Sequence, residues 1–154
     1  MIFALATPIA QSAIGVFRVS GVGCCDVFNG TLNKPITKYR EVFLRDVIWD
    51  GALIDRCSVV FYSGPLSYTG EDSVEVFCHG GLSVIKSLTG VFLGLGFKEA
   101  GPGEFSKIAF ENGKLSLKQT LIVSILPAVK PGMNSLDFTS YIENKIYSEL
   151  NLMN

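Results

Sequence analysis

The chain has 154 residues, of which 48% are hydrophobic and 18% are charged, and its formal net charge is −1. This length and composition predict one domain with a substantial buried core, with or without an appendage. The basic residues are scattered singly, which argues against direct binding to a nucleic-acid backbone, because such binding needs a basic patch.

The hydrophobic residues do not gather into a membrane segment, because no apolar run approaches the ~18 residues that a spanning helix needs. The N-terminus is apolar, but it lacks a basic region and contains Pro8, so we interpret it as a strand rather than a signal peptide. We therefore expect a cytoplasmic protein that does not contact a membrane.

The four cysteines, Cys24, Cys25, Cys57 and Cys78, include no C-x-x-C pair. Without a secretory signal, reduced thiols are the expected state. Zinc could in principle bind Cys78, His79 and the other cysteines, but the spacing matches no structural zinc pattern. We predict small, buried, hydrophobic side chains instead.

The first elements in chain order are two strands and a helix. Residues 14–20 alternate partly between apolar and polar side chains and are expected to pair with residues 2–6. Residues 21–29 predict a short helix that ends near Gly30.

A hairpin is expected next. Residues 40–49 and 52–62 are rich in β-branched and aromatic side chains, as strands are. Asp50-Gly51 between them indicates a type I′ turn, because that turn needs a positive φ at both central positions.

The next elements alternate between strand and helix. Residues 73–78 predict a short strand, and in residues 82–95 the apolar side chains recur at helical spacing. A short segment opens at Phe97, and residues 104–112 predict a helix that ends before a glycine. A further helix is expected to begin near Leu115.

This order predicts an α+β fold with a mixed or antiparallel sheet and helices on one face. The C-terminal part behaves differently, because Pro127, Pro131 and Gly132 interrupt the chain. Beyond them we expect an amphipathic helix, which would have to pack against the main domain or another chain. Its apolar side would consist of Phe138, Tyr141, Ile142, Ile146 and Leu150.

The most informative stretch is residues 63–81, a polar loop that leads into a strand. It holds Glu71 and Asp72 in a turn, Glu75 within the strand and the only histidine, His79. Such loops often carry binding chemistry, so the stretch is a candidate ligand site, although a solvated turn would look similar. We expect Glu71 and Asp72 to cap or shape the turn, and His79 to be a structural residue at a helix start.

Five motifs occur in an order that resembles the N-terminal domain of the tRNA-modification GTPase MnmE (TrmE) family. They are ALATP at residues 4–8, VFRVSG at 16–21, TGEDSVEV at 69–76, HGG at 79–81 and PGEFSKIAFENGKLSL at 102–117. Each motif is short, but the five together are specific, and the resemblance extends to about residue 119.

The resemblance implies a homodimer that binds a tetrahydrofolate derivative, 5-formyl- or 5,10-methylene-tetrahydrofolate, near the dimer interface. It also implies a fold similar to the folate-binding domain of the glycine-cleavage T-protein. Family members continue into a helical domain with an inserted GTPase, and with the flavoprotein MnmG (GidA) they modify carbon 5 of the wobble uridine in certain tRNAs. We therefore expect a MnmE-type domain over residues 1–119 and a divergent helical tail over residues 120–154.

Three residues match the folate-contacting residues of the family: Arg18 in the V-x-R-x-S-G strand, Glu75 after T-G-E-D, and Lys114 in N-x-K-L-x-L. One carboxylate can accept hydrogen bonds from the ring N–H and the exocyclic amine of a pterin together. Arg18 and Lys114 suit either the tail carboxylates of folate or the pterin carbonyl oxygen.

Each of the three also has a structural interpretation. Arg18 could be an exposed cross-strand partner of a carboxylate, and Glu75 could be a solvent-facing residue of an edge strand. Lys114 could simply favour the negative end of a helix dipole.

The sequence also departs from the family. Residues 9–13 replace a glycine-rich turn before the Arg18 strand, and Phe77, Cys78 and Ile108 replace residues usual in the family. No Walker A sequence and no Asn-Lys-x-Asp sequence occurs. We therefore expect no GTP hydrolysis by this chain and no catalysis by it alone.

Three functions remain open. The first is a folate-binding homodimerisation module that presents a one-carbon carrier for tRNA modification and contacts tRNA only indirectly. The second is a dimerisation or interaction fragment that has lost folate binding, which the replaced loop and the unmatched tail favour. The third is an enzyme like the T-protein that transfers a one-carbon group, with Asp72 or His79 as the acid or base.

Overall fold

The computed structural model describes residues 1–10, 12–126, 140–145 and 148. The chain divides into two compact units, Met1–Pro102 and Gly103–Asn154, which we call the first and the second unit.

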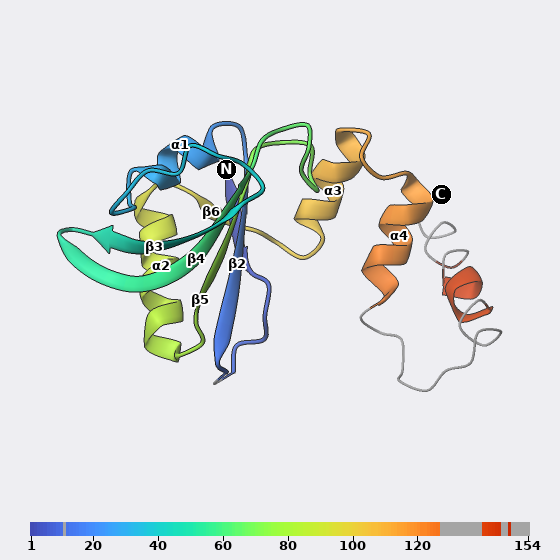
Figure 1. The fold of residues 1–154 in the computed structure, drawn as a ribbon. Helices are drawn as coiled ribbons and strands as arrows, with labels where there is room; N and C mark the ends of the chain where they lie inside the picture. Colours follow the sequence, from blue (N-terminus) through green and yellow to red (C-terminus); the bar gives the residue numbers. More distant parts are fainter. Residues whose placement is uncertain (11, 127–139, 146–147, 149–154) are drawn as a thin grey trace. The chain divides into compact units, whose positions relative to one another are not determined.

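The first unit contains one six-stranded sheet. Its strands are β1 (Ile2–Leu5), β2 (Ile14–Ser20), β3 (Val42–Trp49), β4 (Ala52–Tyr62), β5 (Ser73–His79) and β6 (Lys98–Glu99). The spatial order is β3-β4-β5-β2-β1-β6 (Figure 1). Neighbouring strands are antiparallel except for β1 and β6, which are parallel. The predicted α+β fold with a mixed sheet is therefore confirmed.

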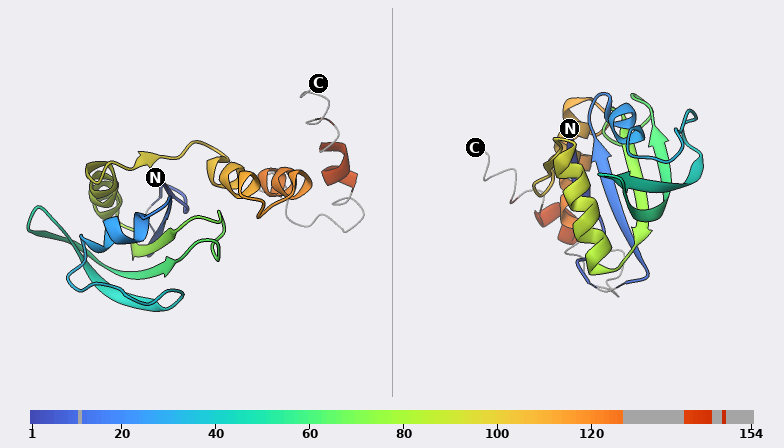
Figure 2. Two further views of the ribbon diagram at one scale, coloured as in Figure 1. Left: turned by 90° about the horizontal axis from the view of Figure 1, so that it is seen from above. Right: turned by 90° about the vertical axis from the view of Figure 1, so that its left-hand side faces the viewer.

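Helices α1 (Cys24–Asn29) and α2 (Leu82–Gly94) lie on the same side of the curved sheet (Figure 2). The core between helices and sheet centres on the Phe92 ring of α2. Its centroid lies 5.0 Å from that of Phe3, 5.2 Å from that of Phe17 and 5.6 Å from that of Phe28. Since aromatic pairs at these separations attract one another beyond their buried area, this cluster holds α1 and α2 on one face. We call the other side of the sheet the opposite face.

The predicted hairpin joins β3 and β4. Asp50 has φ 49° and Gly51 has φ 77°, and Trp49 pairs with Ala52 across the turn. Two consecutive positive φ angles are what a type I′ turn requires, so the Asp-Gly signal is confirmed.

Two elements begin later than their sequence patterns predict. Helix α1 begins at Cys24 rather than at residue 21, because Gly23 has φ 77°, outside the helical region. Strand β3 begins at Val42 rather than at residue 40, because Arg40 has φ 63°, and a left-handed residue interrupts an extended strand.

The second unit contains α3 (Glu104–Glu111) and α4 (Leu117–Ile125). Helix α4 begins with a reciprocal capping box, in which Ser116 and Gln119 each accept a hydrogen bond from the other's backbone N–H. Residues 140–145 are helical and Ile142 is buried. Phe138, Ile146 and Leu150 of the predicted amphipathic helix lie outside the described residues. None of the described helices is long and apolar enough to cross a bilayer.

Candidate functional site

The sheet register places Arg18 and Glu75 directly opposite each other on β2 and β5. Along β5, Val74 and Val76 are buried, so Glu75 between them points to the opposite face. Arg18 Nε donates to Glu75 Oε1 at 3.0 Å, with the Arg18 side chain 56% exposed and that of Glu75 23% exposed. The pair is thus half-open to solvent and within reach of a ligand.

Tyr62 of β4 contacts the same carboxylate from the other side. Its hydroxyl donates to Glu75 Oε2 at 3.3 Å. Burial and the nearby negative charge of Glu75 raise the pKa of the Tyr62 phenol, so the hydroxyl stays protonated at neutral pH. The sequence interpretation missed Tyr62, because no local pattern reveals which residue of β4 lies beside Glu75.

The loop before β5 is held by its own carboxylates. Asp72 accepts hydrogen bonds from the backbone N–H groups of Gly23 and Gly64, each at 3.0 Å. Glu71 Oε2 accepts one from the Ser20 hydroxyl at 3.1 Å. Asp72 therefore ties the loop to the start of α1, which agrees with the expectation that Glu71 and Asp72 shape the turn.

A second polar contact lies at the end of β5. His79 Nδ1 lies 2.7 Å from Asp55 Oδ1, and the His79 backbone N–H donates to Asp55 Oδ2 at 2.9 Å. Burial raises the pKa of the Asp55 carboxyl, but the hydrogen bonds from His79 and Arg56 outweigh burial and hold it below its ordinary value. His79 is therefore anchored to β4 as a structural residue.

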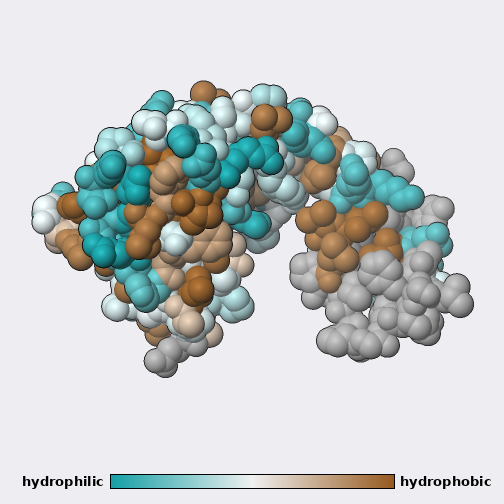
Figure 3. All heavy atoms as spheres, viewed as in Figure 1, coloured by the Kyte–Doolittle hydropathy of each residue, from teal (hydrophilic) through white to brown (hydrophobic). Residues whose placement is uncertain are grey.

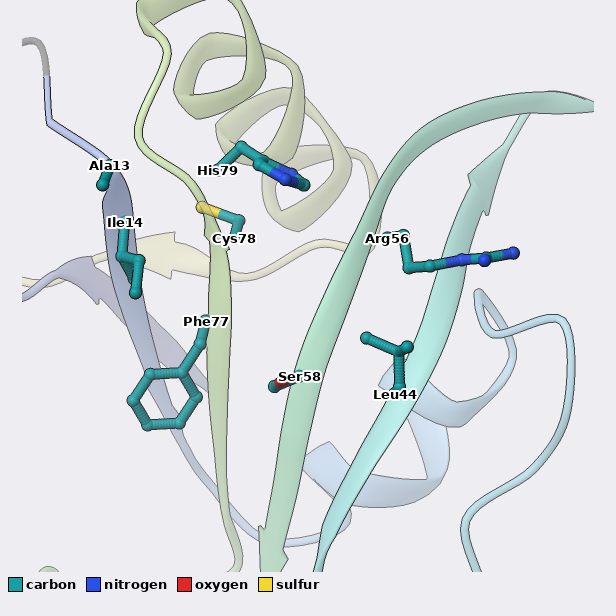
Figure 4. Close-up of a pocket in the computed structure, with 8 residues that line it drawn as sticks. All are labelled: Ala13, Ile14, Leu44, Arg56, Ser58, Phe77, Cys78 and His79. Atoms are coloured by element: carbon teal, nitrogen blue, oxygen red, sulfur yellow. The ribbon is translucent and has the colours of Figure 1, made fainter.

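An open depression of about 290 Å³ lies beside this contact (Figure 4). Its lining residues are Ala13, Ile14, Leu44, Arg56, Ser58, Phe77, Cys78 and His79. Burial raises the pKa of the Cys78 thiol to about 11, so it carries little thiolate at neutral pH and is a poor nucleophile. The lining does not include Arg18 or Glu75, so the depression and the carboxylate site are separate features.

All four cysteines are free and buried, as the sequence predicted. Burial also raises the pKa of the Cys57 thiol. Within the part of the chain that the structure describes, no three His, Cys, Asp or Glu side chains gather in a way that could hold a metal ion.

Residues 1–114 match the family described as GTP-binding protein TrmE N-terminus. The chain belongs to this family. Three similar proteins are named tRNA modification GTPase MnmE. This chain is 41% identical to the protein of Pseudothermotoga lettingae over 120 residues and 43% identical to that of Thermotoga maritima over 121 residues. It is 40% identical to the protein of Aquifex aeolicus over 135 residues. These alignments cover 75%, 75% and 84% of this chain, but 26%, 26% and 29% of the relatives. The chain therefore spans about a quarter of the length of the curated relatives that it matches.

The TrmE match includes all three residues that the sequence analysis singled out. The structure brings Arg18 and Glu75 into contact. Lys114 lies in the second unit, where it is exposed and follows α3. Its backbone N–H donates to the carbonyl of Ala109 at 2.8 Å, so it extends the C-terminal end of α3, where a cation is favourable.

Residues 9, 10, 12 and 13 lie between β1 and β2. Ile9 is 82% exposed. The backbone carbonyl of Ser12 lies close to Gly80. A Cβ added to Gly80 would be 2.3 Å from the Ser12 carbonyl oxygen. Only glycine fits at that position, so Ser12 packs closely against Gly80.

Proposed function

We propose that this chain binds a tetrahydrofolate derivative at Glu75 and self-associates, as the N-terminal part of a tRNA-modification protein of the MnmE type. The observation that carries the proposal is the Glu75 carboxylate, whose side chain is 23% exposed and which is held by Arg18 on the opposite face of a TrmE domain. The name of the relatives, tRNA modification GTPase MnmE, supports the role in tRNA modification. In that role the chain presents a one-carbon carrier in the cytoplasm, and a flavoprotein such as MnmG is the expected partner.

Glu75 has the chemistry that a pterin requires. A pterin presents a ring N–H and an exocyclic amine side by side, and a fixed carboxylate accepts both in a bidentate pair. Arg18 and Lys114 then offer cations for the carboxylates of the folate tail or for the pterin carbonyl oxygen.

Self-association is supported by the apolar surface on the opposite face. Ile14, Val42 and Leu44 are 57%, 69% and 60% exposed on neighbouring parts of the sheet. Figure 3 shows hydrophobic side chains gathered on one part of the surface of the first unit. A second copy would remove this surface from water, and stable dimers bury about 800 Å² per partner.

Calorimetry with 5-formyltetrahydrofolate tests the binding site. Replacing Glu75 with alanine (Glu75→Ala) should weaken binding at least about tenfold, because each hydrogen bond to a charged group contributes about 1.5–3 kcal/mol. Glu41→Ala is the matched control, because Glu41 is a surface glutamate that pairs with Lys38. Equal heats for wild type and Glu75→Ala would show that the site assignment is wrong.

The second candidate is a dimerisation fragment that has lost folate binding, and the substituted loop at residues 9–13 favours it. A thermal melt separates the two candidates. At a hundredfold excess over Kd, a bound ligand stabilises the folded state by ~2.7 kcal/mol, which shifts the melting temperature visibly. A dimer whose melting temperature does not respond to folate would favour the second candidate.

A further inference from the structure

We propose that Tyr62 is a positioning residue that, together with Arg18, fixes the plane of the Glu75 carboxylate for a heterocycle with two adjacent N–H donors. The inference rests on the proposed function, because it assigns a specificity role within the same site. Tyr62 is not among the three residues that the family resemblance points to.

The contacts come from both neighbours of β5. In the sheet, β5 lies between β4 and β2. Tyr62 on β4 donates to Glu75 Oε2, and Arg18 on β2 donates to Glu75 Oε1. Each carboxylate oxygen can accept two hydrogen bonds, so one acceptor position on each oxygen remains for a ligand.

These two donors restrict a motion that the carboxylate would otherwise have. The terminal torsion of a glutamate side chain is broad, so a carboxylate without partners samples many orientations. A donor on each oxygen, from opposite sides, limits this rotation before any ligand arrives. Binding then costs less conformational freedom, which is the general benefit of preorganisation.

A phenol suits this task because it is a neutral donor. A second cation beside Glu75 would neutralise the charge that makes the carboxylate a strong acceptor. The charged groups near the Tyr62 hydroxyl are Glu75, Arg18 and Arg40, and their combined effect with burial leaves the phenol protonated. Tyr62 therefore orients the carboxylate without competing for its charge.

The experiment compares two probes on the full 154-residue chain: 5-formyltetrahydrofolate and its 2-desamino analogue, which lacks the exocyclic amine. Wild type should prefer the first probe. In Tyr62→Phe, affinity for 5-formyltetrahydrofolate should fall about three- to tenfold. The preference for 5-formyltetrahydrofolate over the analogue should shrink as well. The analogue offers a single N–H, which bonds equally well to a rotated carboxylate.

Two further variants complete the design. Tyr39→Phe is the matched control, because it removes a hydroxyl from another part-exposed tyrosine that makes no hydrogen bond to Glu75. Replacing Tyr62 with 4-aminophenylalanine restores an N–H donor at the same place and should restore the preference. This variant also tests the inference if Tyr62→Phe does not fold.

The outcomes separate the inference from the proposed function. If wild type binds neither probe, the proposed function fails and the inference fails with it. If wild type binds and discriminates but Tyr62→Phe behaves like wild type, the inference alone is overturned. Equal weakening of both probes in Tyr62→Phe also overturns it, because Tyr62 would then act without orienting Glu75.

Discussion

The carboxylates of the first unit differ in the hydrogen-bond donors that hold them. Asp72 accepts two backbone N–H groups, and Asp55 accepts the backbone N–H of His79, so both complete the scaffold. Glu75 accepts only side-chain donors in the described structure, from Arg18 and Tyr62. A carboxylate held by side chains at a part-exposed surface can share its oxygens with a ligand, which distinguishes Glu75 from Asp72 and Asp55.

Asp55 should make stability depend on pH in the acid range. Its pKa is lowered by folding from an ordinary value of 3.8, so its contribution is present above that value and is lost as the pH falls through the folded pKa. Asp55→Asn should cost about 1–3 kcal/mol at pH 7, because the charged partner of His79 is removed. The variant should also show a shallower loss of stability on acidification.

Urea unfolding at several pH values measures this effect, with Asp50→Asn as the control. Asp50 carries the same charge at the exposed hairpin tip, where its positive φ also accommodates asparagine. Equal pH profiles for wild type and Asp55→Asn would contradict the structural role of the Asp55–His79 contact.

At the scale of elements, backbone conformation decides where the chain turns. The β3–β4 hairpin depends on two positive φ angles at Asp50 and Gly51, whereas α2 runs through Gly90 in helical conformation. A Cβ at either glycine would meet nothing within 4 Å. The two sites therefore separate the conformational effect of a side chain from any steric clash.

Substitution by alanine should have opposite signs at these two glycines. Gly51→Ala should destabilise the protein by about 1–2 kcal/mol, because an L-residue is strained in the left-handed region. Gly90→Ala should stabilise it by up to about 1 kcal/mol, because alanine loses less backbone freedom in a helix. Chemical denaturation of both variants measures the difference, and the same sign for both would contradict this account of the hairpin.

At the scale of the whole molecule, the family match covers the first unit and the start of the second. The TrmE match ends at residue 114, inside the second unit, and the curated relatives are about four times as long as the aligned part. GTP hydrolysis and tRNA modification by those relatives are therefore activities of longer proteins. For this chain, the proposed properties are ligand binding and self-association.

Self-association should depend on the opposite face of the sheet. Leu44 is 60% exposed there, and Leu44→Lys should shift a dimer toward the monomer, because burying a lysine in an apolar contact is costly. Leu93→Lys is the control, because Leu93 is 53% exposed on α2. Light scattering measures the molar mass, and a dimer that survives Leu44→Lys would place the contact elsewhere.

The local elements and the tertiary contacts were not equally predictable. The hairpin, β2, β4 and α2 followed from turn chemistry and hydrophobic period, which are properties of neighbouring residues. Arg18 and Glu75 became candidates only through the family resemblance, since each alone resembles an ordinary surface residue. The starts of α1 and β3 were displaced by positive φ angles at Gly23 and Arg40, which the residue patterns did not reveal.

The sequence by itself determined the fold class and the family, because hydrophobic periodicity and motif order are properties of the chain alone, and it proposed Arg18, Glu75 and Lys114 as site residues. Only the tertiary structure decided that Arg18 and Glu75 face each other and that Tyr62 holds the second oxygen. The physical reason is strand register: β4, β5 and β2 are adjacent in space but distant in sequence, and a shift of one residue would turn Glu75 into the core.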